Sequence, residues 1–136
     1  MSVLRPFEQA TKALEGRAEN GQHGTIGEVL PALLGLKSHL VSCYNQFKRR
    51  QEKDEEEHLT TAFHVLETSI NNGLDHMDKY IAITSEIPVY LAAVVLDPRL
   101  KWESLENMAK REHPTTSGFT EWVQNAKFLV QRLWEQ

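Results

Sequence analysis

One apolar stripe constrains the fold of this chain more than any other feature of its sequence. Between residues 59 and 81, apolar residues recur at steps of three and four, which places them on one face of an α-helix. The stripe consists of Leu59, Phe63, Leu66, Ile70, Leu74, Met77 and Ile81. Gly73 interrupts it at a cost of about 1 kcal/mol relative to alanine, which indicates a close helix crossing. Almost nothing in the chain alternates at period two, so we expect an all-α fold.

Helical spacing recurs along the rest of the chain. Further stripes cover residues 3–17, 29–47, 100–110 and 119–133. Thr25-x-x-Glu28 has the pattern of a capping box, and Pro31 either kinks the helix that follows or marks its true start. The glycine-containing stretches 18–24 and 113–118 are expected to be loops.

One element is ambiguous between helix and strand. Within residues 89–96, residues 91–96 are continuously apolar, and a run this short fits a buried helix or a buried strand. Pro88 at the first position and two alanines favour a helix. We therefore expect an irregular bundle of five or six helices that forms one domain over residues 1–136, since no repeat or low-complexity linker divides the chain.

Charge and composition narrow the function classes. The chain has 136 residues and a net charge of −4, which argues against a general binder of the DNA backbone. One cysteine forms no internal disulfide, and neither a signal peptide nor an apolar run of about 20 residues is visible. By elimination we expect a soluble nuclear or cytoplasmic protein.

Residues able to carry chemistry do not form a recognisable constellation. His39 and Cys43 lie four apart on one helix, but zinc requires three or four ligands, so we expect a packed thiol beside a surface histidine. Asp75 and Asp78 have a spacing that could hold Mg²⁺, although a solvated face with local charge pairs is the favoured interpretation. We predict no metal site, no cofactor and no catalytic residue in the chain.

Basic and aromatic residues give two further interpretations. Residues 48–50 are basic and could contact phosphates, but acidic residues 54–57 follow at once, which favours a solvated, self-pairing stretch. Trp122 and Trp134 are candidates for an interaction surface. A tryptophan as close to the end of the sequence as Trp134 either clamps the core or anchors another molecule.

Two blocks of sequence carry a family resemblance. The first is Asp78-Lys79-Tyr80, and the second is Leu96-Asp97-Pro98-Arg99-x-Lys101, preceded by Ala92 and followed by Trp102. With supporting similarity in residues 4–31 and 122–134, the chain resembles hAT-type transposases, most of all their fungal branch. The resemblance covers nearly the whole chain, and the LDPR-x-K block is its most specific part.

The resemblance implies cut-and-paste DNA transposition by a larger enzyme. In that family an RNase-H-like fold carries three metal-binding carboxylates, and a helical insertion interrupts it. This chain resembles the helical part, and no catalytic residue of the family can be placed on it. Asp97 is expected to cap the following helix, with Pro98 at its first position.

Three functions are then open. The first is a non-catalytic helical fragment or relic of a hAT-type transposase, nuclear and with at most auxiliary DNA binding. The second is a domesticated protein–protein interaction module that uses exposed apolar surface. Because a piece of a larger enzyme should expose apolar surface, we also expect the isolated chain to aggregate or dimerise. The third, an independent enzyme, lacks the required ligand clusters.

Overall fold

The computed structural model describes residues 3–15, 26–51 and 60–135. Six α-helices and no strand occur in these ranges, which confirms the prediction of an irregular all-α bundle. The helices are α1 (Arg5–Leu14), α2 (Ile26–Gln51), α3 (Thr60–Glu86), α4 (Pro88–Leu96), α5 (Lys101–Glu112) and α6 (Thr116–Trp134). Residues 89–96, which the sequence left open between helix and strand, therefore belong to a helix, α4.

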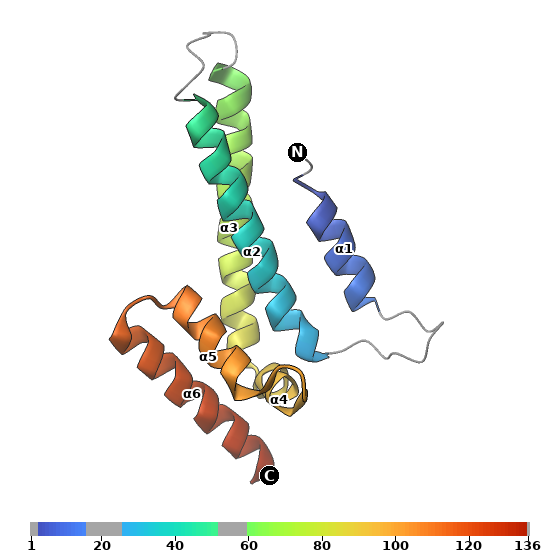
Figure 1. The fold of residues 1–136 in the computed structure, drawn as a ribbon, viewed down its shortest axis with the longest axis vertical. Coiled ribbons are helices and arrows are strands. Elements are labelled where there is room, and N and C mark those ends of the chain that lie inside the picture. The colour runs from blue at the N-terminus through green and yellow to red at the C-terminus, as the bar shows by residue number, and fades with distance from the viewer. Residues whose placement is uncertain (1–2, 16–25, 52–59, 136) are drawn as a thin grey trace.

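Two long helices organise the molecule. α2 and α3 lie side by side along its long axis, and α4, α5 and α6 gather at their lower end in Figure 1. α1 packs against α2 and buries none of its residues; Leu4, predicted on its apolar face, is 74% exposed. The chain turns by 79° between α3 and α4, because Ile87 precedes a proline and is held in an extended conformation.

The core has two parts. The lower cluster contains buried residues from α2 to α6: Leu30, Ile81, Leu91, Ala92, Val94, Leu105, Ala126 and Val130. The upper cluster contains Leu40, Cys43 and Ile70, with Phe7 of α1 packed on it. Met77, half-buried on α3, packs against both clusters and joins them.

Gly27 and Gly73 each lie where their helix contacts a neighbouring helix. A Cβ built on Gly27 would lie 2.9 Å from the carbonyl oxygen of Ala93, so α2 and α4 cross with almost no space between them. A Cβ on Gly73 would lie 3.4 Å from Leu40 Cδ1 of α2, so α3 also meets α2 at this glycine, through a side chain and not through the backbone.

Several predicted boundaries change. Pro31 lies inside α2, which begins at Ile26, so the proline does not mark the start of the helix. The loop predicted at 113–118 is shorter, because α6 begins at Thr116 and the Thr115 hydroxyl accepts a hydrogen bond from the Gly118 N–H. Thr25 of the predicted capping box lies outside the described residues.

α2 also has the length and apolarity of a membrane span. The segment Ile26–Arg50 meets this test by length and composition alone, which the search for a continuous apolar run did not anticipate. A central helix of a soluble bundle meets the same test, and α2 contacts α1, α3 and α4 along its length. α3 and α4 also meet the test if the bent pair is taken as one span, and one or two such candidates among the described residues are weak evidence for a membrane.

Candidate functional site

A cleft opens where the lower ends of α2 and α3 meet α5 and α6. Its volume is about 320 Å³, within the range typical of ligand sites. The apolar part of its lining, which we call the floor, consists of Leu30, Leu34, Ile81, Ala82, Met108, Ala109 and Trp122. The polar part, which we call the rim, consists of Asp78, Ser85, Glu86, Glu112, His113 and Asn125. Four helices thus contribute to one concave, mixed surface, which we call the cleft.

An ion-pair network fixes one side of the cleft. The Lys37 ammonium of α2 lies 2.8 Å from Asp78 Oδ1 of α3 and also contacts the Glu112 carboxylate of α5. Burial lowers the pKa of Lys37, but its hydrogen bonds to the two carboxylates outweigh this effect and raise the pKa above the ordinary lysine value. The network therefore ties three helices together through one charged side chain.

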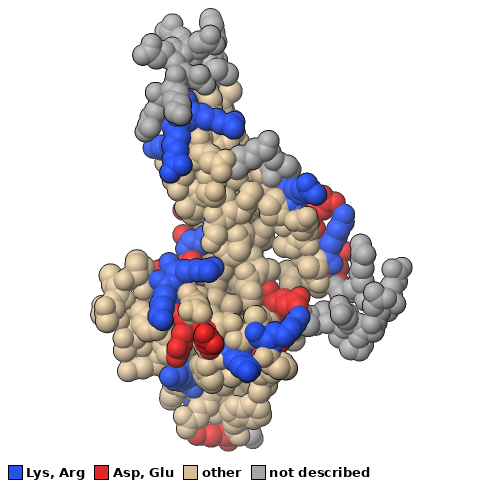
Figure 2. All heavy atoms as spheres, viewed as in Figure 1, with Lys and Arg blue, Asp and Glu red and all other residues tan. Residues whose placement is uncertain are grey.

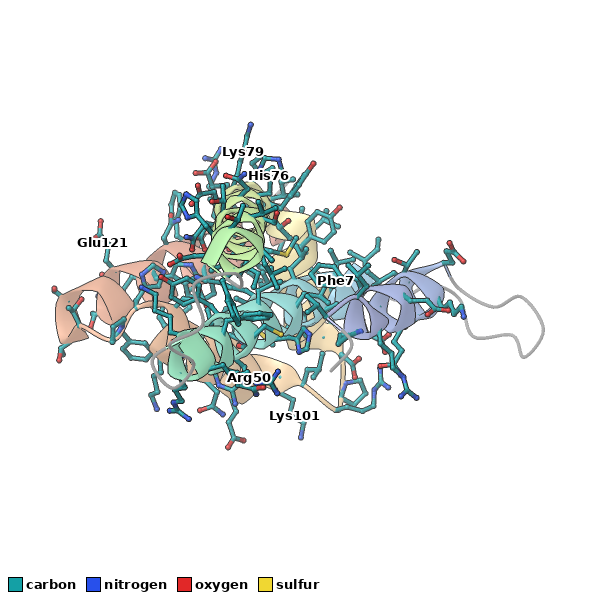
Figure 3. The ribbon with its side chains drawn as sticks, turned by 90° about the horizontal axis from the view of Figure 1, so that it is seen from above. Phe7, Arg50, His76, Lys79, Lys101 and Glu121 are labelled. Atoms are coloured by element: carbon teal, nitrogen blue, oxygen red, sulfur yellow. The ribbon has the colours of Figure 1, made fainter. Side chains whose placement is uncertain are left out.

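In the Asp78-Lys79-Tyr80 block, the first residue contacts another helix and the other two are exposed. Asp78 belongs to the network with Lys37, so it pairs with another helix and not with the local partners expected from the sequence. Lys79 and Tyr80 are exposed, Tyr80 by 56%, and Lys79 extends away from α3 beside His76 in Figure 3. Only the first residue of the block thus lines the cleft.

The LDPR-x-K block forms the turn between α4 and α5. Asp97 ends α4, and its carboxylate accepts hydrogen bonds from the Arg99 backbone N–H at 2.9 Å and from the Arg99 guanidinium. The Arg99 guanidinium also lies 3.1 Å from Glu28 Oε1 on α2. The block therefore fixes its own turn and connects that turn to the start of α2.

The expected helix cap at Asp97 is wrong in one respect. α5 begins only at Lys101, so Pro98 lies in the turn and is not the first residue of that helix. Asp97 therefore caps a turn through the Arg99 N–H and does not cap α5. Lys101 has a φ of 58°, a left-handed conformation that lets the chain change direction as α5 starts. Lys101 and Leu96 are both exposed.

Acid should weaken this turn. Hydrogen bonds from the Arg99 side chain and backbone hold the pKa of Asp97 below its ordinary value of about 3.9. The carboxylate therefore stabilises the fold above that ordinary value, and this contribution is lost as the pH falls through the lower folded-state pKa. We expect Asp97→Asn to lower Tm at neutral pH and to make Tm less dependent on pH below about 4.

The measurement is thermal unfolding followed by circular dichroism across the acidic range. Asp75→Asn is the matched control, because Asp75 is an exposed aspartate on α3 outside the turn. An Asp97→Asn protein with the wild-type pH profile would contradict the proposed role of this carboxylate.

The two candidate tryptophans have different environments. Trp122 is half-buried on the floor of the cleft, with its ring centroid 6.3 Å from that of His113. Trp134 is 66% exposed, so it does not clamp the core. It lines a separate, open groove with Leu96 and Trp102. Trp122 is thus the aromatic residue that belongs to the cleft.

Of the other sequence candidates, His39 and Cys43 are in contact, and no third possible metal ligand joins them among the described residues. Cys43 is fully buried, as expected, and burial raises the pKa of its thiol. His39 lies 3.4 Å from the Cys43 sulfur and 3.1 Å from the Val3 carbonyl oxygen, so it is half-buried and not a surface residue. Across 3–15, 26–51 and 60–135, no three His, Cys, Asp or Glu side chains are placed to hold a metal ion.

The basic residues at the end of α2 were expected to pair with the acidic residues that follow them in the sequence. Among the described residues, Lys48 lies 3.4 Å from Glu67 of α3 and over the Tyr44 ring. The acidic residues expected to pair with it lie within 52–59, outside the described part of the chain.

Comparison of the chain with models of protein families, with curated proteins and with solved structures finds no match.

Proposed function

We propose that this chain is a non-catalytic helical module of a hAT-type cut-and-paste DNA transposase, a nuclear protein with at most auxiliary DNA binding. The observation that carries the proposal is the LDPR-x-K block within a resemblance that extends over most of the chain. In the fold this block fixes the α4–α5 turn and connects it to α2. The LDPR-x-K block is the most specific part of the resemblance, and here it holds the fold together. This supports an architectural role for the module.

The pairing of the motif carboxylates supports the non-catalytic part of the proposal. Asp78 faces the Lys37 ammonium, and Asp97 faces the Arg99 guanidinium. A carboxylate that ligates a catalytic metal must direct its oxygens at the ion, whereas these two direct oxygens at cations of the same chain. The ion pairs of Asp78 and Asp97 therefore favour a structural role for both carboxylates.

The distribution of charge supports an auxiliary and not a dominant role for DNA. Basic side chains gather at the end of α2, at Lys48, Arg49 and Arg50, near the top of the face shown in Figure 2. Over the lower helices of that face, basic and acidic residues are intermixed, and no continuous basic stripe crosses it. A small basic group of this kind supports few phosphate contacts.

DNA binding tests this part of the proposal. With a fluorescein-labelled duplex, we expect anisotropy titrations to give a Kd of about 10⁻⁴ to 10⁻⁶ M at physiological salt, which weakens as salt is added. The double variant Arg49→Gln/Arg50→Gln should weaken binding and reduce the slope of log K against log salt by about 2. Both residues are exposed, so the fold should persist.

Arg132→Gln is the control, since Arg132 is an exposed arginine in the last turn of α6. It should leave the salt slope unchanged. An equal response to both variants would place the DNA contact elsewhere. A wild-type protein without salt-dependent binding would contradict the DNA role and favour the second candidate function.

That second candidate is a protein–protein interaction module without DNA activity. The observation that favours it is the cleft, whose described lining residues include three carboxylates and neither lysine nor arginine. Exposed apolar side chains on the same half of the molecule, Leu96 and Trp134 among them, support contact with another protein or with a second copy of the chain.

A further inference from the structure

The cleft has a surplus of negative charge. Its rim carries the carboxylates of Asp78, Glu86 and Glu112, and Lys37 supplies a single ammonium to two of them. Glu86 is exposed in the last residue of α3, where the helix dipole adds further negative potential. An occupant that carries positive charge is therefore attracted to the rim, while a phosphate group is repelled.

Because the cleft is also lined by apolar side chains, an occupant needs apolar surface as well as positive charge. Leu34, Met108 and Trp122 are half-buried and offer accessible apolar surface in the same cleft as the carboxylates. A lysine or arginine side chain suits such a site, because its aliphatic stem covers apolar surface while its charged head reaches the rim. Arginine fits best, since its planar guanidinium stacks on an indole and pairs with carboxylates at two points.

We propose that the cleft binds a basic segment of a partner protein, receiving an arginine side chain between Trp122 and the carboxylates of Glu86 and Glu112. A neighbouring apolar side chain of the same segment covers the rest of the floor. The volume of about 320 Å³ accommodates a small group of side chains and not a whole helix. This inference rests on the binding role of the module and is independent of its membership in a transposase family.

A synthetic peptide provides the probe. We expect the full chain to bind fluorescein-labelled Ala-Leu-Arg-Leu-Leu-Arg-Ala and not the same peptide with glutamate in place of arginine. Peptide titration into ¹⁵N-labelled protein should shift the indole N–H signal of Trp122. Trp102 and Trp134 line the other groove and serve as internal controls whose signals stay in place.

Two substitutions should change the affinity in opposite directions. Glu86→Lys reverses a rim charge at a helix C-terminus, where a cation is favourable, and should weaken peptide binding by about fivefold or more. Lys37→Gln removes the ammonium that competes for Asp78 and Glu112, and should strengthen binding by a few-fold. A general loss of folding cannot produce an increase in affinity.

Glu135→Lys is the matched control, because Glu135 is an exposed glutamate at the C-terminus of α6 and does not line the cleft. It should leave peptide binding unchanged. The proposal is overturned if Glu86→Lys and Glu135→Lys weaken binding equally, if the glutamate peptide binds as well, or if the Trp122 signal does not move. Failure of these tests with intact DNA binding leaves the proposed function standing, and the reverse result favours the interaction module alone.

Discussion

Replacing Gly27 by alanine is expected to destabilise the protein by about 1–3 kcal/mol, although alanine is the better helix former by about 1 kcal/mol. The new Cβ would lie 2.9 Å from the carbonyl oxygen of Ala93 and 3.1 Å from its carbonyl carbon. Both are backbone atoms of α4, so neither can rotate away, and α2 and α4 must separate. Urea denaturation followed by circular dichroism measures the loss in the free energy of unfolding.

The same helix contains its own control. Gly35 is exposed in α2, and a Cβ built on it meets nothing within 4 Å. Gly35→Ala should therefore stabilise the protein by about 0.5–1 kcal/mol, through helix propensity alone. Opposite signs at the two glycines are the expected result. Stabilisation by both substitutions would show that α2 and α4 do not cross as closely as the structure indicates.

A larger loss is expected from Leu91→Ala, at about 2–5 kcal/mol. Leu91 is fully buried in the lower cluster, where α2, α3, α4, α5 and α6 meet. Its truncation removes apolar contacts and leaves a cavity that five helices cannot all move to fill. The urea midpoint should fall while the m-value stays constant, because the surface exposed on unfolding is nearly unchanged.

Leu96→Ala makes the same chemical change five residues further along α4, where the side chain is 61% exposed. We expect an effect within about 0.5 kcal/mol, since most of this side chain is already exposed to solvent. A loss at Leu96 comparable to that at Leu91 would contradict the assignment of the buried face of α4.

Periodicity predicted the helical class well, and α3 shows why. Its apolar stripe extends over more than five turns, so a strand or an irregular segment cannot satisfy it. Ile70 and Ile81 from that stripe are buried, in the upper and lower clusters respectively. A segment as short as α4 gave no such signal, and only its proline and alanines distinguished helix from strand.

The buried face of α2 was harder to predict. The stripe from Val29 to Phe47 places one face toward the core, yet Leu30 is 1% exposed while Val29 is only half-buried. The lower part of α2 packs against α3 and α4, whereas the upper part packs against α1 and α3. A helix with different neighbours along its length buries different faces, and the sequence of α2 alone does not reveal those neighbours.

The candidate site was predicted only in part. Trp122 was identified from its residue type, but Lys37, Glu86 and Glu112 were not, because each is an ordinary charged residue in its own helix. Their significance comes from segments far apart in the sequence that the fold brings together. The LDPR-x-K block was found by resemblance, and its contact with Glu28 across 71 residues required the structure.

The two-part core has a consequence for how the molecule responds to an occupant. Among the described residues, Met77 packs against both clusters, and otherwise the long helices α2 and α3 connect them. Opening of the upper half, with α1, therefore costs less than unfolding the lower half, where five helices share one core. Ligand binding in the cleft should slow amide hydrogen exchange mainly below Met77, so that the upper half behaves as a separate, more readily opened unit.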